Sequence, residues 1–345
     1  MLLAWHLGRQ VLPAYSNKFS RKDFTLPQLF ACLVVREHQK KSYRGVEALL
    51  NDSRHWCRAI GMKKVPDHNT LCRGFHVILN ERNAAKMVDL LARWFALHKL
   101  LGPTLAIDSS LYDTHHRSRH YEQRCRHYSS RLARTANARR SRSAKRTPKL
   151  AIGVDTRSHA ILAERPRVGM GSDCRDFAPV LHGACRRNRG IQVVLADAGY
   201  DSDSNHRLAR EELGVRSLIK ADAGRPSDKP PTSRYRQLMK RTLAGSQAGR
   251  PYGQRAQAET VNSMLKRNLG DALRARSCEA RCNEQLLRVI THDLMLLLLL
   301  FLEGRDRALA CPKIGRPRHA SHRAPAGAAK ARPHFGHRSS SGREG

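Results

Sequence analysis

Acidic residues are scarce in this chain of 345 residues. Asp and Glu number 29 against 64 Lys and Arg, which gives a formal net charge of +35 at pH 7. This imbalance excludes an acidic or neutral surface and predicts association with a polyanion, because each neutralised phosphate releases counterions. Arg is the commoner of the two basic residues, and its planar guanidinium favours bidentate contacts with phosphate and guanine. We therefore expect a nucleic-acid partner.

Several other features are missing. The nine cysteines include no Cys-x2-Cys pair, so we expect reduced thiols of a cytosolic protein. No cleavable signal is evident, and the longest apolar run, residues 294–302, is shorter than the ~20 residues that span a bilayer. These absences predict a soluble, cytoplasmic protein without a membrane partner. No glycine-rich phosphate loop is present, so no nucleotide cofactor is expected.

The segment around Glu259 has the periodicity of a helix with one polar and one apolar side. At about 100° per residue, Arg255, Glu259 and Lys266 project from the same side. The opposite side carries an apolar stripe made of Val261, Met264, Leu265 and Leu269. Taken alone, Arg255 and Glu259 are also compatible with an ordinary ion pair worth ~0.3–0.5 kcal/mol.

Two further carboxylates end short apolar runs that are typical of buried strands. Asp108 follows Leu105-Ala-Ile107, and Asp197 follows residues 193–196. Asp113 and Asp201 are nearby rivals, for which a helix cap or turn is the simpler interpretation. We expect Asp108 and Asp197 to leave the sheet at its edge, where functional side chains gather.

The chain resembles the DDE transposases of bacterial insertion sequences in four residues at fixed spacing, Tyr252-x2-Arg255-x3-Glu259-x6-Lys266. The contexts Asp108-Ser and Asp197-Ala-Gly-Tyr-Asp-Ser agree with the same family, and the resemblance covers roughly residues 26–302. It implies an α/β fold: a ribonuclease H-like mixed sheet flanked by helices. It also implies two divalent metal ions and cut-and-paste DNA chemistry.

Each site residue has an implied or expected role. The resemblance makes Asp108, Asp197 and Glu259 the catalytic residues and the ligands of two Mg²⁺ ions, for which Mn²⁺ substitutes. Hard oxygen donors suit these ions, which activate the attacking hydroxyl and stabilise the leaving oxygen. Three converging acids repel one another unless a cation is bound. The expected DNA-binding residues are Tyr252, Arg255, Lys266, Asn262, Arg234 and Arg236.

Residues 1–100 read as a helical, helix-turn-helix-like domain for DNA binding or dimerisation. Thr25, Ser42 and Asp67 are expected to cap three of its helices. Basic residues between short helices are typical of a DNA-binding domain. A packing bundle with solvated basic residues is the alternative.

Residues 101–303 alternate between strand and helix patterns, which predicts the catalytic domain. The expected strands cover residues 105–108, 149–154, 160–164, 191–196 and 215–221. The expected helices cover residues 176–185, 205–213 and 283–302, besides the helix of Glu259. Basic insertions are expected at 117–149 and 224–250, and a disordered basic tail at 304–345. A zinc site is not expected in the first insertion. The spacing of the possible ligands fits no known zinc-binding pattern; these are His115, His116, His120, Cys125 and His127.

The pattern as a whole predicts a transposase. We expect it to bind the terminal inverted repeats of its element, hydrolyse the DNA at the ends and join the 3′-hydroxyls to target DNA, acting as a homodimer because two ends must be paired. One alternative is a nuclease of the same fold that lacks strand transfer. Another is an inactive or domesticated derivative that only binds DNA.

Overall fold

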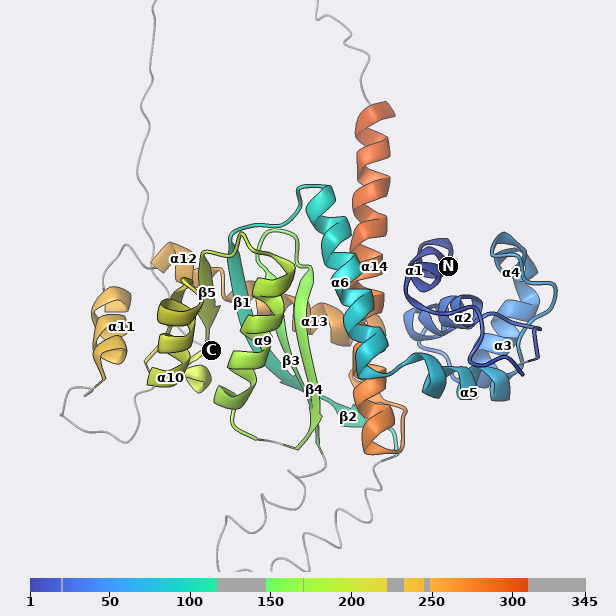
Figure 1. The fold of residues 1–345 in the computed structure, drawn as a ribbon, viewed down its shortest axis with the longest axis horizontal. Coiled ribbons are helices and arrows are strands. Elements are labelled where there is room, and N and C mark those ends of the chain that lie inside the picture. The colour runs from blue at the N-terminus through green and yellow to red at the C-terminus, as the bar shows by residue number, and fades with distance from the viewer. Residues whose placement is uncertain (20, 117–146, 170, 222–232, 245–248, 310–345) are drawn as a thin grey trace, which may run out of the picture. The chain divides into compact units, whose positions relative to one another are not determined.

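A mixed β-sheet forms the centre of the fold, with helices on both faces (Figure 1). The computed structural model describes all residues except 20, 117–146, 170, 222–232, 245–248 and 310–345. The strands of the sheet are β1 (Thr104–Leu111), β3 (Pro148–Asp155), β4 (Ile161–Val168), β5 (Val193–Ala196) and β6 (Arg216–Ile219).

The strand order is β4-β3-β1-β5-β6. The pairs β1–β3 and β3–β4 are antiparallel, whereas β1–β5 and β5–β6 are parallel. The chain thus makes a three-stranded meander and then adds two parallel strands on the other side of β1. This order and pairing confirm the predicted ribonuclease H-like mixed sheet, and the hairpin of β3 and β4 confirms the predicted turn at Asp155.

The described helices after β1 are α9 (Cys174–Arg187), α10 (Asp203–Arg207), α11 (Arg234–Ala244), α12 (Gly249–Gly253), α13 (Ala256–Leu269) and α14 (Cys278–Leu309). A 3₁₀ turn, η1 (Ala198–Tyr200), and a π-helical turn, η2 (Leu208–Glu212), lie between β5 and β6. The helix predicted over residues 205–213 is therefore divided between α10 and η2. A short parallel pair, β2 (Asp113–Thr114) with β7 (Ala272–Leu273), was not predicted.

The central strand β1 divides the core into two hydrophobic clusters. Leu105 and Ile107 lie in the cluster that α9 contributes to, and Ala106 lies in the cluster that contains Val261, Leu265 and Leu269 of α13. Figure 1 shows α9 and α13 on opposite faces of the sheet. Because side chains alternate between the two faces of a strand, Asp108 lies on the α13 face.

Before β1, the described residues form the helices α1 (Leu2–Val11), α2 (Leu26–His38), α3 (Tyr43–Asp52), α4 (Arg54–Ala59), α5 (His68–Ile78) and α6 (Glu81–Leu97). All three predicted caps are confirmed: Thr25 forms a capping box with Gln28, Ser42 Oγ accepts from the Gly45 amide at 3.0 Å, and Asp67 accepts from two amides of α5. Such caps satisfy backbone N–H groups that the first helical turn leaves unpaired.

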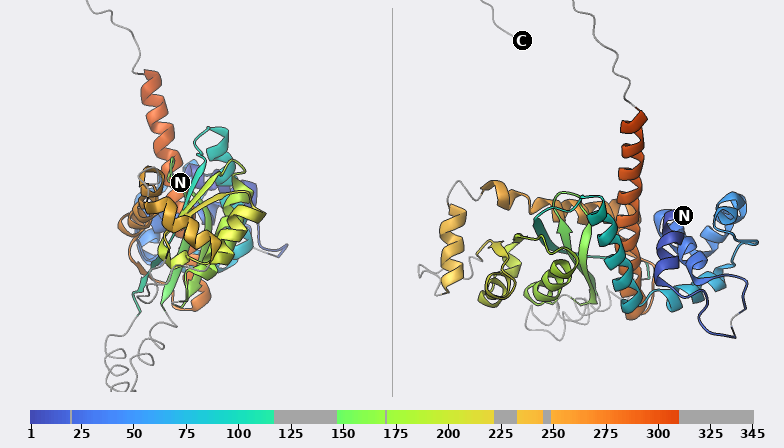
Figure 2. Two further views of the ribbon diagram at one scale, coloured as in Figure 1. Left: turned by 90° about the vertical axis from the view of Figure 1, so that its left-hand side faces the viewer. Right: turned by 45° about the horizontal axis from the view of Figure 1, so that its top comes forward.

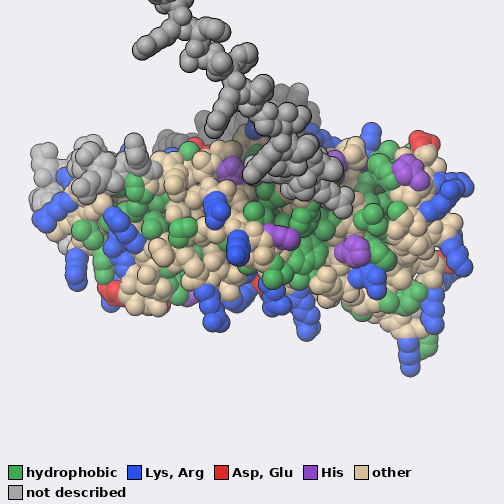
Figure 3. Space-filling view, turned by 90° about the horizontal axis from the view of Figure 1, so that it is seen from above, with side chains coloured by type: hydrophobic (Ala, Val, Ile, Leu, Met, Phe, Trp, Pro, Cys, Tyr) green, Lys and Arg blue, Asp and Glu red, His purple; other side chains and the backbone are tan. Residues whose placement is uncertain are grey.

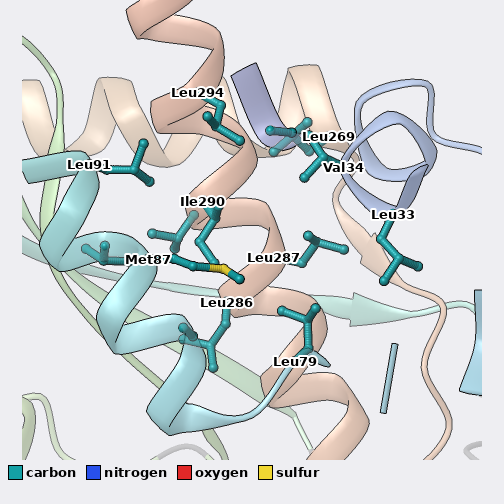
Figure 4. Packing of buried hydrophobic residues seen from close by; sticks show 14 of the residues in the cluster. Leu33, Val34, Leu79, Met87, Leu91, Leu269, Leu286, Leu287, Ile290 and Leu294 are labelled. Atoms are coloured by element: carbon teal, nitrogen blue, oxygen red, sulfur yellow. The ribbon is translucent and has the colours of Figure 1, made fainter. Parts of the chain in front are cut away.

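Helix α14 lies between the sheet and the helices α1–α5 (Figures 1 and 2). Its Leu286 and Ile290 pack toward Met87 and Leu91 of α6 (Figure 4). By length and composition alone, Cys278–Leu302 is the one helix in the described residues that is apolar enough to cross a membrane, but 61% of its most apolar window is buried inside the fold. Core helices of soluble proteins have the same property.

The predicted insertions and tail are only partly described. Residues 117–146 lie outside the described residues, whereas Pro148 and Lys149 already belong to β3. The second insertion contains α11, which the sequence pattern did not indicate. Helix α14 continues to Leu309, and the rest of the predicted tail lies outside the described residues. Met1–Glu303 form one compact unit, and the division at residue 100 stays a prediction.

Candidate active site

Asp108 and Asp197 occupy equivalent positions on neighbouring strands. Ile107 of β1 pairs with Ala196 of β5 in parallel register. Asp108 is the next residue of β1, and Asp197 directly follows β5. Asp197 has extended backbone angles, φ −76° and ψ 168°, so strand alternation continues through it. Both carboxylates therefore project on the α13 face, at the same edge of the sheet.

Asp108 is half-buried, and its pKa is raised above the ordinary value of an aspartate. Asn262 of α13 donates from Nδ2 to Asp108 Oδ2 at 3.0 Å. Burial raises the pKa of Asp108, and the charge of Glu259 raises it further, whereas hydrogen bonds from the Ser109 backbone and Asn262 lower it. The contact between α13 and Asp108 is thus made by Asn262, and Glu259 acts on Asp108 through its charge.

Glu259 is paired with Arg255 across the start of α13. Arg255 Nη1 lies 2.6 Å from Glu259 Oε1, and 52% of the Glu259 side chain is exposed. Burial alone would lower the pKa of Arg255, but the hydrogen bond and charge of Glu259, together with the charge of Asp197, raise it. Arg255 thus lies within electrostatic reach of Asp197 and Glu259. The predicted one-sided arrangement of Arg255 and Glu259 is present, although the helix begins one residue after Arg255.

Tyr252 precedes this pair and lies over the end of β5. Its hydroxyl donates to the carbonyl oxygen of Ala196 at 3.4 Å, and the Arg255 guanidinium is 6.0 Å from its ring centroid. Burial raises the pKa of Tyr252, and the charge of Asp197 adds to that effect. Tyr252, Arg255 and Asp197 therefore form one group of neighbours.

Lys266 lies two turns beyond Glu259, near the C-terminal end of α13. Its Nζ is 5.5 Å from the ring centroid of Tyr112, a buried residue that follows β1. This contact holds Lys266 on the side of the helix where β1 ends. The sequence did not single out Tyr112, because an isolated aromatic residue after a strand has no specific signal.

Arg234 and Arg236, the two residues of α11 that were expected to bind DNA, have different surroundings. Arg236 Nε lies 2.7 Å from Asp201 Oδ2, and 33% of its side chain is exposed. Arg234 is exposed and lies 5.8 Å from the ring centroid of Tyr235. Arg236 thus anchors α11 to the core, while Arg234 remains accessible. Asp201 is fully buried in this ion pair, which disfavours it as a rival metal ligand.

The three acids suit a hard divalent cation by their chemistry. Among the described residues, no three His, Cys, Asp or Glu side chains are arranged so that they could hold a metal ion, and Glu259 is paired with Arg255 instead. The carboxylate oxygens are nevertheless the donors that Mg²⁺ prefers. A bound cation would stabilise the charged form of Asp108, whose pKa burial raises. Of the residues weighed for zinc, His120, Cys125 and His127 lie outside the described residues.

Comparison with known proteins identifies the family of this chain. The sequence matches the family model described as "Transposase DDE domain" over residues 99–294, and this range includes all three acids. A search of curated proteins finds no match.

Two solved structures of Mos1 transposase were also found. The paired-end complex with left transposon end is 13% identical, with 80% of this chain and 81% of that chain covered and a TM-score of 0.22. The pre-cleavage transpososome is 11% identical, with 75% and 78% covered and a TM-score of 0.21. Both TM-scores are too low to establish a common fold. The family model, however, covers more than half of the 345 residues, and the protein therefore belongs to the transposase DDE domain family.

Proposed function

We propose that this protein is a cut-and-paste transposase. It binds the terminal inverted repeats of its own element, hydrolyses the DNA at the ends, and joins the 3′-hydroxyls to target DNA by transesterification. The main support is the placement of Asp108 in β1 and of Asp197 directly after β5 at matching positions of the parallel register, with the charge of Glu259 raising the pKa of Asp108.

In this proposal Asp108, Asp197 and Glu259 hold two Mg²⁺ ions, with Mn²⁺ as a substitute. The ions would activate the attacking hydroxyl and stabilise the leaving oxygen. Asp108 contributes a half-buried carboxylate of fixed position, because the amide of Asn262 holds one of its oxygens. Glu259 contributes an exposed carboxylate that can exchange Arg255 for another partner.

The basic and aromatic residues of the signature would bind the DNA backbone. A phosphate near Asp197 and Glu259 would lie beside Arg255, whose guanidinium forms charge-assisted hydrogen bonds with phosphate oxygens. Tyr252 lies beside Arg255 and would pack against the adjoining sugar. Lys266 would bind the transposon end farther along α13, and Arg234 would add an exposed contact from α11. Arg236 would act indirectly by anchoring α11.

The expected partners are double-stranded DNA at the terminal repeats and at the target, and a second copy of this chain. Figure 3 shows Lys and Arg side chains scattered over one face, with few Asp and Glu, in line with the net charge of +35. We place DNA recognition in the helical domain of residues 1–100, with the basic tail from residue 304 adding attraction. No nucleotide cofactor and no membrane are involved, and the protein acts in the cytoplasm.

Cleavage of supercoiled plasmid by the full-length protein tests this function. We expect nicking in Mg²⁺ or Mn²⁺ but not in EDTA, and a loss of about 10³-fold or more in Asp108→Ala and Asp197→Ala. Joining of pre-cleaved element ends to a second plasmid separates a transposase from a nuclease without strand transfer. If the wild-type protein shifts DNA on a gel but nicks it in neither metal, it is a DNA-binding derivative instead.

A further inference from the structure

Asn262 connects the helix of Glu259 to the strand of Asp108. It lies one turn after Glu259 on α13, is only 6% exposed, and donates from Nδ2 to Asp108 Oδ2 at 3.0 Å. A residue so buried has little surface to offer a DNA backbone. The structure therefore favours a role inside the site over the DNA contact that the sequence predicted.

The other polar atom of Asn262 is unsatisfied. Its Oδ1 is buried and has no hydrogen-bond partner among the described residues. Leaving a buried polar atom unpaired costs about 1–3 kcal/mol, and native structures rarely keep such atoms without a reason. The unpaired acceptor lies on the residue whose donor holds a catalytic carboxylate, so it indicates a site that lacks one of its components.

We propose that Asn262 is a positioning residue for the metal ligand Asp108, an inference that rests on the metal site of the proposed function. Its Nδ2 holds Asp108 Oδ2 and so sets the direction of the carboxylate. Because Asn262 and Glu259 lie on one helix, the same hydrogen bond aligns the helix acid with the strand acid. Its unpaired Oδ1 would be available as a hydrogen-bond acceptor for water that Mg²⁺ usually keeps when bound. Mutation of a residue that orients a metal ligand in this way typically lowers metal affinity or activity about 10–100-fold.

Mn²⁺ binding by the full-length protein tests the inference without relying on catalysis. Free Mn²⁺ is measured by electron paramagnetic resonance in the wild type and in Asn262→Leu and Asn262→Ala. We expect the Mn²⁺ dissociation constant to rise about 10–100-fold in both variants. Asn268→Ala is the matched control, because Asn268 is exposed on the same helix, and it should bind Mn²⁺ like the wild type.

DNA binding is measured in parallel by fluorescence anisotropy with a duplex in EDTA. A positioning residue leaves this affinity unchanged, within about twofold. Wild-type Mn²⁺ affinity in both Asn262 variants would overturn the inference, and weaker DNA binding with normal Mn²⁺ affinity would return Asn262 to the DNA interface. Thermal melting checks folding; Asn262→Leu keeps the side-chain volume, and Asn262→Ala decides the matter if the Leu variant is unfolded.

The inference and the proposed function can fail separately. If Asp108→Ala abolishes Mn²⁺ binding and the Asn262 variants weaken it, but the wild type cuts no DNA, the inference stands and the function fails. If the wild type cuts DNA and Asp108→Ala loses Mn²⁺ while the Asn262 variants keep it, the function stands and the inference fails. Absence of Mn²⁺ binding by the wild type overturns the inference.

Discussion

Two glutamate–arginine pairs with the same four-residue spacing lie on consecutive stretches of the chain, and their surroundings differ. Arg255 and Glu259 are 2.6 Å apart, with 23% and 52% of their side chains exposed. Glu284 and Arg288 of α14 are 3.3 Å apart, with 1% and 0% exposed. The first pair is open to solvent and can separate at little cost, whereas the second is held inside the fold. The four-residue spacing predicts that each Glu and Arg will form an ion pair, but burial decides whether that pair is accessible to solvent.

The buried pair belongs to a cluster that joins distant parts of the chain. Arg288 donates from Nε to Glu37 of α2 at 2.9 Å and from its terminal nitrogens to the carbonyls of Gly270 and Ala272. Glu284 accepts from the backbone amides of Arg274 and Ala275. Burial raises the pKa of Glu37, and the charge of Arg288 opposes that rise. The cluster therefore holds α2, β7 and α14 together and has no accessible charge to offer a substrate.

The sharpest test of this contrast is Arg288→Met. It would remove the cation paired with the buried Glu284 and leave the buried Glu37 with Arg36 but without Arg288, so we expect the free energy of unfolding to fall by about 3–5 kcal/mol. Urea unfolding followed by circular dichroism measures the change. Arg276→Met, at an exposed position just before α14, should change it by less than ~0.5 kcal/mol. Equal effects of the two variants would contradict the structural role of Arg288.

The buried side of α14 also predicts a dependence on pH. Burial lowers the pKa of His292 to about 4, so the unfolded chain takes up this proton near pH 6.5 and the folded protein only near pH 4. Stability from this group is complete above about pH 6.5 and is lost as the pH falls toward 4. At pH 5 the loss amounts to about 2 kcal/mol.

Urea unfolding at pH 7 and pH 5 measures this effect as the difference between wild type and His292→Leu. The difference is needed because burial raises the pKa values of Glu37 and Asp293, and a raised carboxyl pKa adds stability as the pH falls. We expect the loss between the two pH values to be about 2 kcal/mol smaller in His292→Leu. Replacing the exposed His76 should leave it unchanged, and the same loss in all three proteins would refute the assignment.

The smallest expected stability change is at the exposed pair. Glu259→Gln removes one partner of a half-exposed ion pair, so the free energy of unfolding should change by less than ~0.5 kcal/mol. Metal-dependent nicking should nevertheless be lost. A destabilisation comparable to that of Arg288→Met would show that both ion pairs stabilise the fold and would contradict the difference inferred from their burial.

Local rules predicted much of the fold. The caps at Thr25, Ser42 and Asp67 depend on residues within three positions of the helix start, so neighbours in sequence suffice to identify them. Strand alternation likewise brought Asp108 and Asp197 to one edge. Helix α11 was missed because it lies in a segment whose prolines and basic residues suggested a loop.

Other features depended on contacts that no local pattern contains. Asn262 shares the polar side of α13 with Glu259, and periodicity alone could not tell which residue would be exposed and which would pack on β1. That choice follows from how α13 crosses the sheet. Arg236 similarly has the appearance of an exposed DNA contact in the sequence, and only the fold of α10 and α11 brings it to Asp201.

The sequence by itself identified the family, and it predicted a polyanionic partner and the acidic triad, since charge and spacing are properties of short segments. Tertiary structure alone decided that one Glu–Arg pair is exposed at the site and the other buried in the core. It also decided that Asn262 holds Asp108, 154 positions away in the chain. The reason is physical: burial and hydrogen-bond partners depend on which distant segments pack together, and residue spacing along one segment does not specify that packing.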